Sequence, residues 1–375
     1  MQNKFFPEIK NKFGFGLMRL PLLDAEDTTA IDIEQMKKMV DLFIERGFNY
    51  FDTAHPYHKT CSETAVKAAL TSRYSRDQYI LTNKLSQPFF ETEEEVRPLI
   101  ESQLEACGVE YFDFLLMHAQ NKTNFEKYKK CRAYEIGFEL KKEGKVKHVG
   151  LSFHDTADVL DNILTTYPEV EVVQLQFNYF DYESDTVQSR KCYEVCEKHG
   201  KPVIVMEPIR GGNLIKLPDD AEELVKAAGI GKAELAIRYA ASFDNIMMVL
   251  SGMHCIEDMD MNTAFMADFK PLSDEEMALA AKVAECIKSK MVVPCTGCRY
   301  CVDGCPMQIS IPDLFTCLNS NNMFKDWPSK AYYSARTAGK GKASDCVACG
   351  QCEGVCPQNL KIIDLLKDVA AAFEQ

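Results

Sequence analysis

The sequence lacks the features that mark membrane, secreted and nucleic-acid-binding proteins. Its longest uncharged apolar stretch, residues 246–253, is far short of the roughly 20 residues that a membrane-spanning helix needs. The amino terminus has no apolar signal-peptide core, so we expect no secretory signal. Basic charge is scarce, because 43 Lys and Arg stand against 56 Asp and Glu and give a net charge of −13. A protein that binds nucleic acid or an acidic membrane through many phosphates needs a basic surface. We therefore expect a cytoplasmic protein that binds neither nucleic acid nor a membrane.

Cysteine is abundant instead. The chain of 375 residues has 16 cysteines, and eight of them form two runs, Cys295–Cys305 and Cys346–Cys356. In a reducing compartment, clustered cysteines indicate metal ligation or redox chemistry before disulfides. We expect a large domain over residues 1–272, a connecting helix over 273–290 that begins with a Ser273–Glu276 capping box, and a cysteine-rich domain over 291–375.

The clustered cysteines form two copies of one pattern, C-x-x-C-x-x-C-x-x-x-C-P, which bacterial ferredoxins use for [4Fe–4S] clusters. Zinc sites prefer paired C-x-x-C knuckles, so the third evenly spaced cysteine favours iron, with zinc and disulfides as alternatives. In two-cluster ferredoxins the fourth cysteine of each run ligates the other cluster, which predicts two crossed ligand sets. One set is Cys295, Cys298, Cys301 and Cys356, and the other is Cys346, Cys349, Cys352 and Cys305. The region resembles a small α+β ferredoxin domain.

The first 290 residues alternate short apolar runs with longer segments of helical period. The predicted strands are residues 12–17, 48–53, 79–84, 112–118, 146–153, 172–177, 202–207 and 246–252. The predicted helices between them are residues 31–46, 62–72, 91–107, 125–142, 156–165, 186–199 and 232–242. Eight such units in about 250 residues predict an α/β fold, the (β/α)8 TIM barrel. The rival is a doubly wound sheet, but Gly14–Gly16 is too short for its G-x-G-x-x-G fingerprint.

Titratable residues follow three consecutive predicted strands at the ends where a barrel carries its active site. Asp52 ends the second strand, with Tyr57 shortly after it, Lys84 ends the third, and His118 ends the fourth. A tyrosine with a pKa near 10 becomes a better acid when a nearby cation favours the phenolate. Lys84 can supply that cation, Asp52 can position it, and His118 can hydrogen-bond a carbonyl oxygen. Together they predict a proton donor and a carbonyl polariser.

These residues belong to motifs that follow one another along the barrel region. The motifs are Gly14–Met18, Phe51–Ala54 with Tyr57, Ser62 and Glu63, Thr82–Lys84, Leu115–His118, Val149–Ser152, Gln174–Tyr179, and Pro208 with Gly211 and Gly212. In these motifs the sequence resembles the aldo/keto reductase superfamily. The resemblance implies NAD(P)H-dependent reduction of a carbonyl, or the reverse oxidation of an alcohol. It implies that Tyr57 is the general acid, that Lys84 and Asp52 lower its pKa, and that His118 orients the substrate.

The resemblance also implies a set of cofactor contacts. They are Gly16, Met18, Asp52, Ser152, Gln174, Asn178, Met206, Pro208, Gly211, Gly212, Gly252 and Asn262, with Arg210 as a further candidate for the pyrophosphate. Ser152, Gln174 or Asn178 would hold the carboxamide. Where NADPH-preferring members place a Lys and an Arg on the 2′-phosphate, this chain has Gly252 and Asp258. A phosphate dianion favours Arg or Lys, so NADH and NADPH both stay open.

Hydride transfer moves two electrons, whereas an iron–sulfur cluster moves one at a time. Because of this mismatch, two alternatives stay open beside a reductase with an attached electron-transfer domain. One is a ferredoxin-linked reductase with a barrel-bound flavin, although no sequence signal for flavin is present. The other is an electron-transfer or partner-binding protein with an idle barrel. Residues 325–342 carry a local charge of +4, which suits either a dock for an acidic one-electron carrier or an offset to the cluster charge.

Overall fold

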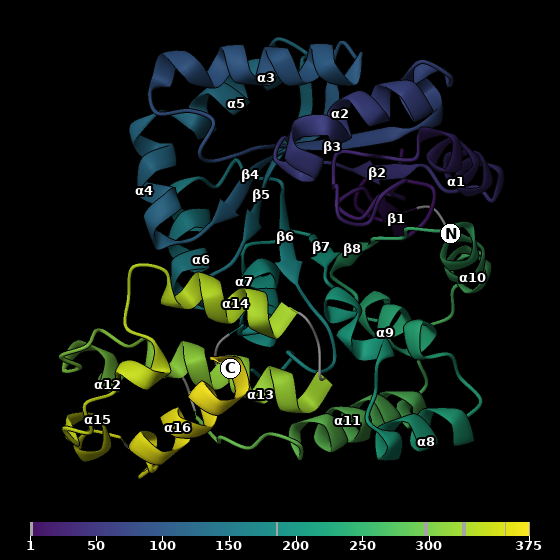
Figure 1. Cartoon of the computed structure of the whole chain (residues 1–375). Coiled ribbons are helices and arrows are strands. Elements are labelled where there is room, and N and C mark those ends of the chain that lie inside the picture. The colour runs from purple at the N-terminus through teal and green to yellow at the C-terminus, as the bar shows by residue number, and fades with distance from the viewer. Residues whose placement is uncertain (1–2, 185–186, 296–298, 325–327, 357, 375) are drawn as a thin grey trace. The chain divides into compact units, whose positions relative to one another are not determined.

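The computed structural model describes all residues except 1–2, 185–186, 296–298, 325–327, 357 and 375. It divides into two compact units (Figure 1). The first comprises residues 1–211 and 232–277, and the second comprises residues 212–231 and 278–375. We expected the large domain to end at residue 272; in the structure, residues 212–231 group with the second unit and residues 273–277 with the first. Over the described ranges, no helix is both long and apolar enough to cross a bilayer.

The first unit is the predicted TIM barrel. Its eight parallel strands pair in sequence order and close on themselves through β1 and β8 (Figure 1). They are β1 (Phe13–Gly16), β2 (Tyr50–Asp52), β3 (Ile80–Leu85), β4 (Phe112–Gln120), β5 (Val146–Phe153), β6 (Val172–Gln176), β7 (Val203–Met206) and β8 (Ile246–Ser251). Every strand coincides with a predicted one, because the strands of a parallel sheet are covered by helices and therefore read as continuous apolar runs.

The helices of this unit follow the strands as the alternation predicts. They are α1 (Ile33–Glu45), α2 (Cys61–Val66), α3 (Glu93–Cys107), α4 (Lys122–Lys130), α5 (Ala133–Lys142), α6 (Ala157–Thr166), α7 (Ser189–Lys198), α9 (Lys232–Ala241) and α10 (Ile256–Ala267). The single helix predicted over residues 125–142 is two helices, because Arg132 between them has a left-handed φ of 48°. Helix α10 follows β8 and was not predicted.

The amino-terminal segment closes one end of the barrel. Phe6 and Ile9 are buried in a cluster with the interior side chains Tyr50 and Phe114. Asn3 fixes the segment by donating a hydrogen bond from its side-chain nitrogen to the Met247 carbonyl oxygen at 2.8 Å. These residues meet the starts of the strands, so the carboxyl ends are the ends available for a site.

The second unit is helical in its described residues. It contains α8 (Asp219–Ala227), most of α11 (Asp274–Lys288), α12 (Tyr300–Asp303), α13 (Ile311–Phe324), α14 (Pro328–Thr337), α15 (Gln351–Gly354) and α16 (Ile362–Phe373). The predicted capping box at the start of α11 is present, with Ser273 and Glu276 bonded to each other's backbone N–H groups. We expected an α+β ferredoxin arrangement, but no strand occurs among the residues described here. Helices α13, α14 and α16 bury an apolar core of their own that includes Leu314, Phe315, Tyr333 and Leu366.

Candidate functional site

A buried lysine links the predicted catalytic residues after two neighbouring strands. Asp52 ends β2, Lys84 lies near the end of β3, and Tyr57 begins a short 3-10 turn after β2. The Lys84 Nζ donates hydrogen bonds to Asp52 Oδ1 at 2.5 Å, to the Thr53 carbonyl oxygen at 2.9 Å and to the Tyr57 hydroxyl at 3.2 Å. All three ammonium protons therefore have an acceptor, and the Tyr57 oxygen lies beside a fixed cation.

Burial controls the charge state of this group. Burial alone would lower the pKa of Lys84, but the neighbouring Asp52 and Tyr57 outweigh it, so the pKa is raised and the ammonium stays charged. Burial also raises the pKa of Tyr57, Lys84 lowers it in part, and the Asp52 carboxylate raises it further. We expected a lowered Tyr57 pKa, and the net direction is the opposite. Asp52 keeps Lys84 charged and does not itself acidify the phenol.

His118, in β4, completes the predicted group. Its Nδ1 lies 2.5 Å from the Ser86 Oγ, and its ring centre lies 6.1 Å from that of Tyr57. Burial, with a smaller effect from the Lys84 charge, lowers the pKa of His118 to about 3. The imidazole is therefore neutral at neutral pH and offers one N–H donor. Ser86 was missed in the sequence because a serine two residues beyond a strand-end lysine has no distinguishing pattern.

The three candidates for the carboxamide have different surroundings. Gln174 donates from Nε2 to Asp52 Oδ2 at 3.2 Å, and Ser152 accepts from the Ala119 N–H at 2.8 Å, so both lie at the strand ends around the group. Asn178 uses both amide protons and its oxygen within the protein, because it donates to Asp181 and Glu207 and accepts two backbone N–H bonds. A contact from Asn178 to a carboxamide would require one of these bonds to break.

A cation that we did not predict lies at the same end of the barrel. Arg19 follows β1, and its stem packs over Gly252 at the end of β8, where an added Cβ would lie 3.3 Å from the Arg19 Cβ. Its Nη2 lies 3.4 Å from the place that a Cβ on Gly211 would take, and Gly211 has a left-handed φ of 66°. Arg210, in contrast, is paired with Asp181. The sequence signal that could have identified Arg19 is its position shortly after the first predicted strand.

The remaining predicted contacts stand on the same strands or near them. Gly16 pairs in register with Asp52, Met206 ends β7, and Pro208 follows it and is buried. Met18 is exposed. Gly212 begins the second unit and has a φ of 97°.

Asn262 provides a test of whether a nucleotide fits. It lies buried on α10, and its Nδ2 donates to Ser251 Oγ at 3.4 Å. Its Oδ1 is buried with no hydrogen-bond partner among the described residues. Buried acceptors are rarely left without a donor, and the amino group of adenine is a donor of the required kind. On the same helix, Asp258 Oδ2 lies 2.9 Å from His254 Nδ1, so the position expected for a phosphate-binding cation holds a carboxylate.

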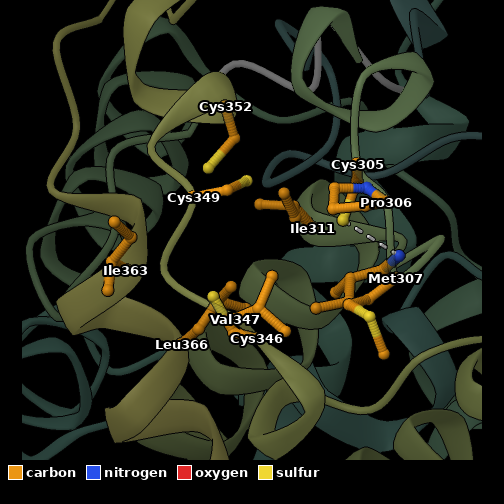
Figure 2. Close-up of a pocket in the computed structure, with 11 residues that line it drawn as sticks. Cys305, Pro306, Met307, Ile311, Cys346, Val347, Cys349, Cys352, Ile363 and Leu366 are labelled. Atoms are coloured by element: carbon orange, nitrogen blue, oxygen red, sulfur yellow. Dashed lines mark hydrogen bonds between the residues drawn. The ribbon is translucent and has the colours of Figure 1, made fainter.

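Cysteines line two cavities of the second unit. One is lined by Cys346, Cys349 and Cys352 of the second run and by Cys305 of the first. Figure 2 shows these four side chains arranged around a common space. The other cavity is lined by Cys295 and Cys301 of the first run and Cys356 of the second, while Cys298 lies outside the described residues. The seven cysteines of the two runs that the structure describes therefore line the cavities in a grouping compatible with the crossed sets.

The walls of these cavities fit iron–sulfur clusters. Apart from sulfur they are mainly apolar, with Ile309, Ile311 and Leu366 in the first and Phe315 and Ile362 in the second. Thiolate sulfur is the soft ligand that iron–sulfur clusters take. The Ile309 N–H donates to the Cys305 Sγ at 3.5 Å.

Comparisons with known proteins match the barrel region and the cysteine-rich region to two separate families. Residues 12–285 match the model of the aldo/keto reductase family, and residues 294–360 match that of a 4Fe-4S dicluster domain. An uncharacterized oxidoreductase of Bacillus subtilis, YqkF, is 23% identical and aligns over 71% of this chain and 90% of its own. L-galactose dehydrogenase of Arabidopsis thaliana is 24% identical over 62% of this chain and 78% of its own.

The solved structures that resemble the chain have the same barrel. An aldo-keto reductase from Klebsiella pneumoniae, in complex with NADPH, matches with a TM-score of 0.59 at 21% identity, over 73% of this chain and 90% of that one. The aldo-keto reductase AKR11C1 from Bacillus halodurans, in its holo form, matches with a TM-score of 0.60 at 22% identity. The family match covers most of the chain, so this protein belongs to the aldo/keto reductase family of oxidoreductases and carries a 4Fe-4S dicluster domain after its barrel.

Proposed function

We propose that the barrel catalyses nicotinamide-dependent reduction of a small carbonyl compound, with Tyr57 as the proton donor. The supporting observation is the Lys84 ammonium, which is buried between Asp52 and the Tyr57 hydroxyl. A bound nicotinamide supplies the hydride, and the carbonyl carbon accepts it. The negative charge that develops on the carbonyl oxygen needs a proton, and the Tyr57 hydroxyl donates it while Lys84 stabilises the phenolate that remains.

His118 positions the carbonyl oxygen in this proposal. Its Nδ1 contact with the Ser86 hydroxyl, at 2.5 Å, is shorter than the 3.3 Å contact of the same hydroxyl with the Lys84 carbonyl oxygen. We assign the hydroxyl proton to the shorter contact, which leaves the His118 proton on Nε2. That N–H then donates a hydrogen bond to the substrate oxygen.

The chain's own residues suggest where the cofactor binds and which form it takes. Gln174 and Ser152 would hold the carboxamide, Arg19 would face the pyrophosphate, and the unpaired Asn262 Oδ1 would accept from adenine. Asp258 would repel a 2′-phosphate and accept a hydrogen bond from a ribose hydroxyl. We therefore propose NADH as the preferred cofactor, although the Klebsiella relative was solved with NADPH.

In the second unit, the two crossed cysteine sets would each hold one [4Fe–4S] cluster, with Cys298 as the fourth ligand of its set. These clusters would exchange single electrons with a carrier outside the barrel.

Tyr57→Phe tests the barrel assignment. The substitution removes the proton donor and keeps the ring, so we expect turnover with NADH and a panel of aldehydes and ketones to fall by about 100-fold or more. The Kd for NADH should stay within about twofold. Normal turnover in Tyr57→Phe would disprove the role of Tyr57, and failure of the wild-type chain to bind any nicotinamide would favour an idle barrel.

Iron, sulfide and flavin analysis of the same anaerobic preparation tests the clusters and the flavin alternative.

A further inference from the structure

We propose that the face around Cys349 is the docking surface for an acidic one-electron carrier protein, and that the cluster of Cys305, Cys346, Cys349 and Cys352 is the one that exchanges electrons with it. This proposal rests on the proposed function, because it requires clusters in the cysteine cavities. It adds which cluster meets the partner and what chemistry the partner has.

The first observation is that apolar side chains are exposed around this cavity. Val347, between two of its cysteines, is 59% exposed, and Met307, which also lines the cavity, is 37% exposed. Cys349 is itself exposed, whereas Cys352 of the same cavity and Cys301 of the other are buried. Exposed apolar side chains that gather at one place mark binding surfaces more often than scattered ones do. An exposed ligand also shortens the path for an electron.

The second observation is a basic turn, residues 340–342, that packs against Met307 in the lining of the same cavity. At Gly341 an added Cβ would lie 2.2 Å from the Met307 carbonyl oxygen, so only glycine permits this approach. Lys340 and Lys342 flank Gly341. The Lys340 Nζ donates to Ser310 Oγ at 3.1 Å, which holds the turn beside the loop that follows Cys305.

The charge balance around the turn indicates the sign of the partner. Over residues 336–349, Arg336, Lys340 and Lys342 stand against Asp345, and Glu374, which accepts a hydrogen bond from the Ser344 N–H, is a second acid beside this segment. The segment therefore keeps a positive charge although the whole chain is strongly negative. An apolar centre beside a basic rim is complementary to a carrier whose own redox centre is surrounded by carboxylates. In the transfer, the reduced carrier loses one electron and the cluster gains it, and no proton moves and no bond breaks.

The experiment uses the anaerobic, iron-loaded full chain and a small acidic [2Fe–2S] ferredoxin as the probe. Calorimetry gives the Kd, and stopped-flow mixing with the reduced probe gives the rate at which the cluster absorbance bleaches. For Lys340→Glu with Lys342→Glu we expect binding and the second-order rate to weaken by about tenfold at low salt, and the difference to shrink at high salt because exposed charges are screened. Val347→Ser should weaken binding by about threefold at any salt concentration, because it removes apolar contact.

Lys38→Glu with Lys142→Glu is the matched control, because it reverses two exposed lysines of the barrel unit and changes the net charge equally. We expect it to change the Kd by less than twofold. Equal weakening of binding by the two double substitutions would overturn the docking surface. An unchanged Kd together with a shifted cluster potential would also overturn it, because the lysines would then only offset the charge of the cluster. Tight binding of a basic cytochrome in place of the acidic probe would also overturn it. A chain without iron would disprove the clusters themselves, and nicotinamide binding by the barrel is measured separately.

Discussion

Lys84 shows how single residues set the chemistry of the barrel. An ammonium that is fully buried would lose its proton without a neighbouring anion, and Asp52 supplies that anion at 2.5 Å. The same burial raises the pKa of Tyr57, so the phenol stays protonated at neutral pH. A general acid must hold its proton until the transition state, and the charge beside it stabilises the phenolate only then. The raised pKa is therefore consistent with the proposed role.

His118 gives a prediction about acid stability. Burial lowers its pKa to about 3 from an ordinary value of 6.5. Between these pH values the unfolded chain binds a proton that the folded imidazole does not, so stability that is fully present above about pH 6.5 is lost as the pH falls towards 3. His118→Gln keeps a hydrogen-bonding side chain and cannot titrate. We expect the urea unfolding free energy of the wild type to fall more steeply than that of the variant between pH 6.5 and 4. Parallel curves would contradict the lowered pKa.

At the scale of elements, the approach of β5 to its neighbours depends on Gly150. An added Cβ there would lie 2.5 Å from a Val172 methyl, 2.6 Å from the Val172 carbonyl oxygen and 2.7 Å from Leu116. The backbone oxygen cannot move aside without disturbing the β5–β6 pairing, which includes Gly150 and Val172 in register. We expect Gly150→Ala to lower the unfolding free energy by about 1–3 kcal/mol in chemical denaturation.

Gly137, on α5, is the matched control for Gly150. Its added Cβ would meet the terminal methyl of Met117 at 2.9 Å, and a methionine end can turn away. Alanine is also the better helix former, so Gly137→Ala should be neutral or stabilising. Equal destabilisation by both substitutions would show that the close approach at Gly150 carries no special cost.

The strands were predictable because burial on both sides gives each an unbroken apolar run, and the strand ends then placed Asp52, Lys84 and His118 together. The break between α4 and α5 at Arg132 was not predictable, because no residue type in this charged helical stretch indicates a left-handed φ. Arg19 was missed for another reason. Its place depends on the approach of β1 to Gly252 and Gly211, which are distant in sequence. The cysteine spacing predicted the crossed sets, but not the helices α13 and α14, which lie between the two runs.

At the scale of the whole molecule, the crossing of ligands makes the two cysteine runs interdependent. Each cavity is lined by one cysteine from the other run, Cys305 in the first cavity and Cys356 in the second. The buried core beneath them also joins segments from both runs, since Cys301 and Cys352 belong to one apolar cluster. Neither run is expected to hold its cluster alone, whereas the barrel has a closed sheet of its own.

This interdependence predicts the effect of one cysteine substitution. Cys305 lies in the first run but lines the cavity of the second, so Cys305→Ser should remove the cluster of Cys346, Cys349 and Cys352 and leave about half of the iron. Cys317→Ser is the control, because Cys317 is buried in the same unit and lines neither cavity. It should retain all of the iron. Iron and sulfide analysis with electron paramagnetic resonance of the reduced protein measures the loss, and nicotinamide binding should be unchanged in both variants because the barrel sheet closes without strands from the second unit. Full iron in Cys305→Ser would mean that the ligands do not cross.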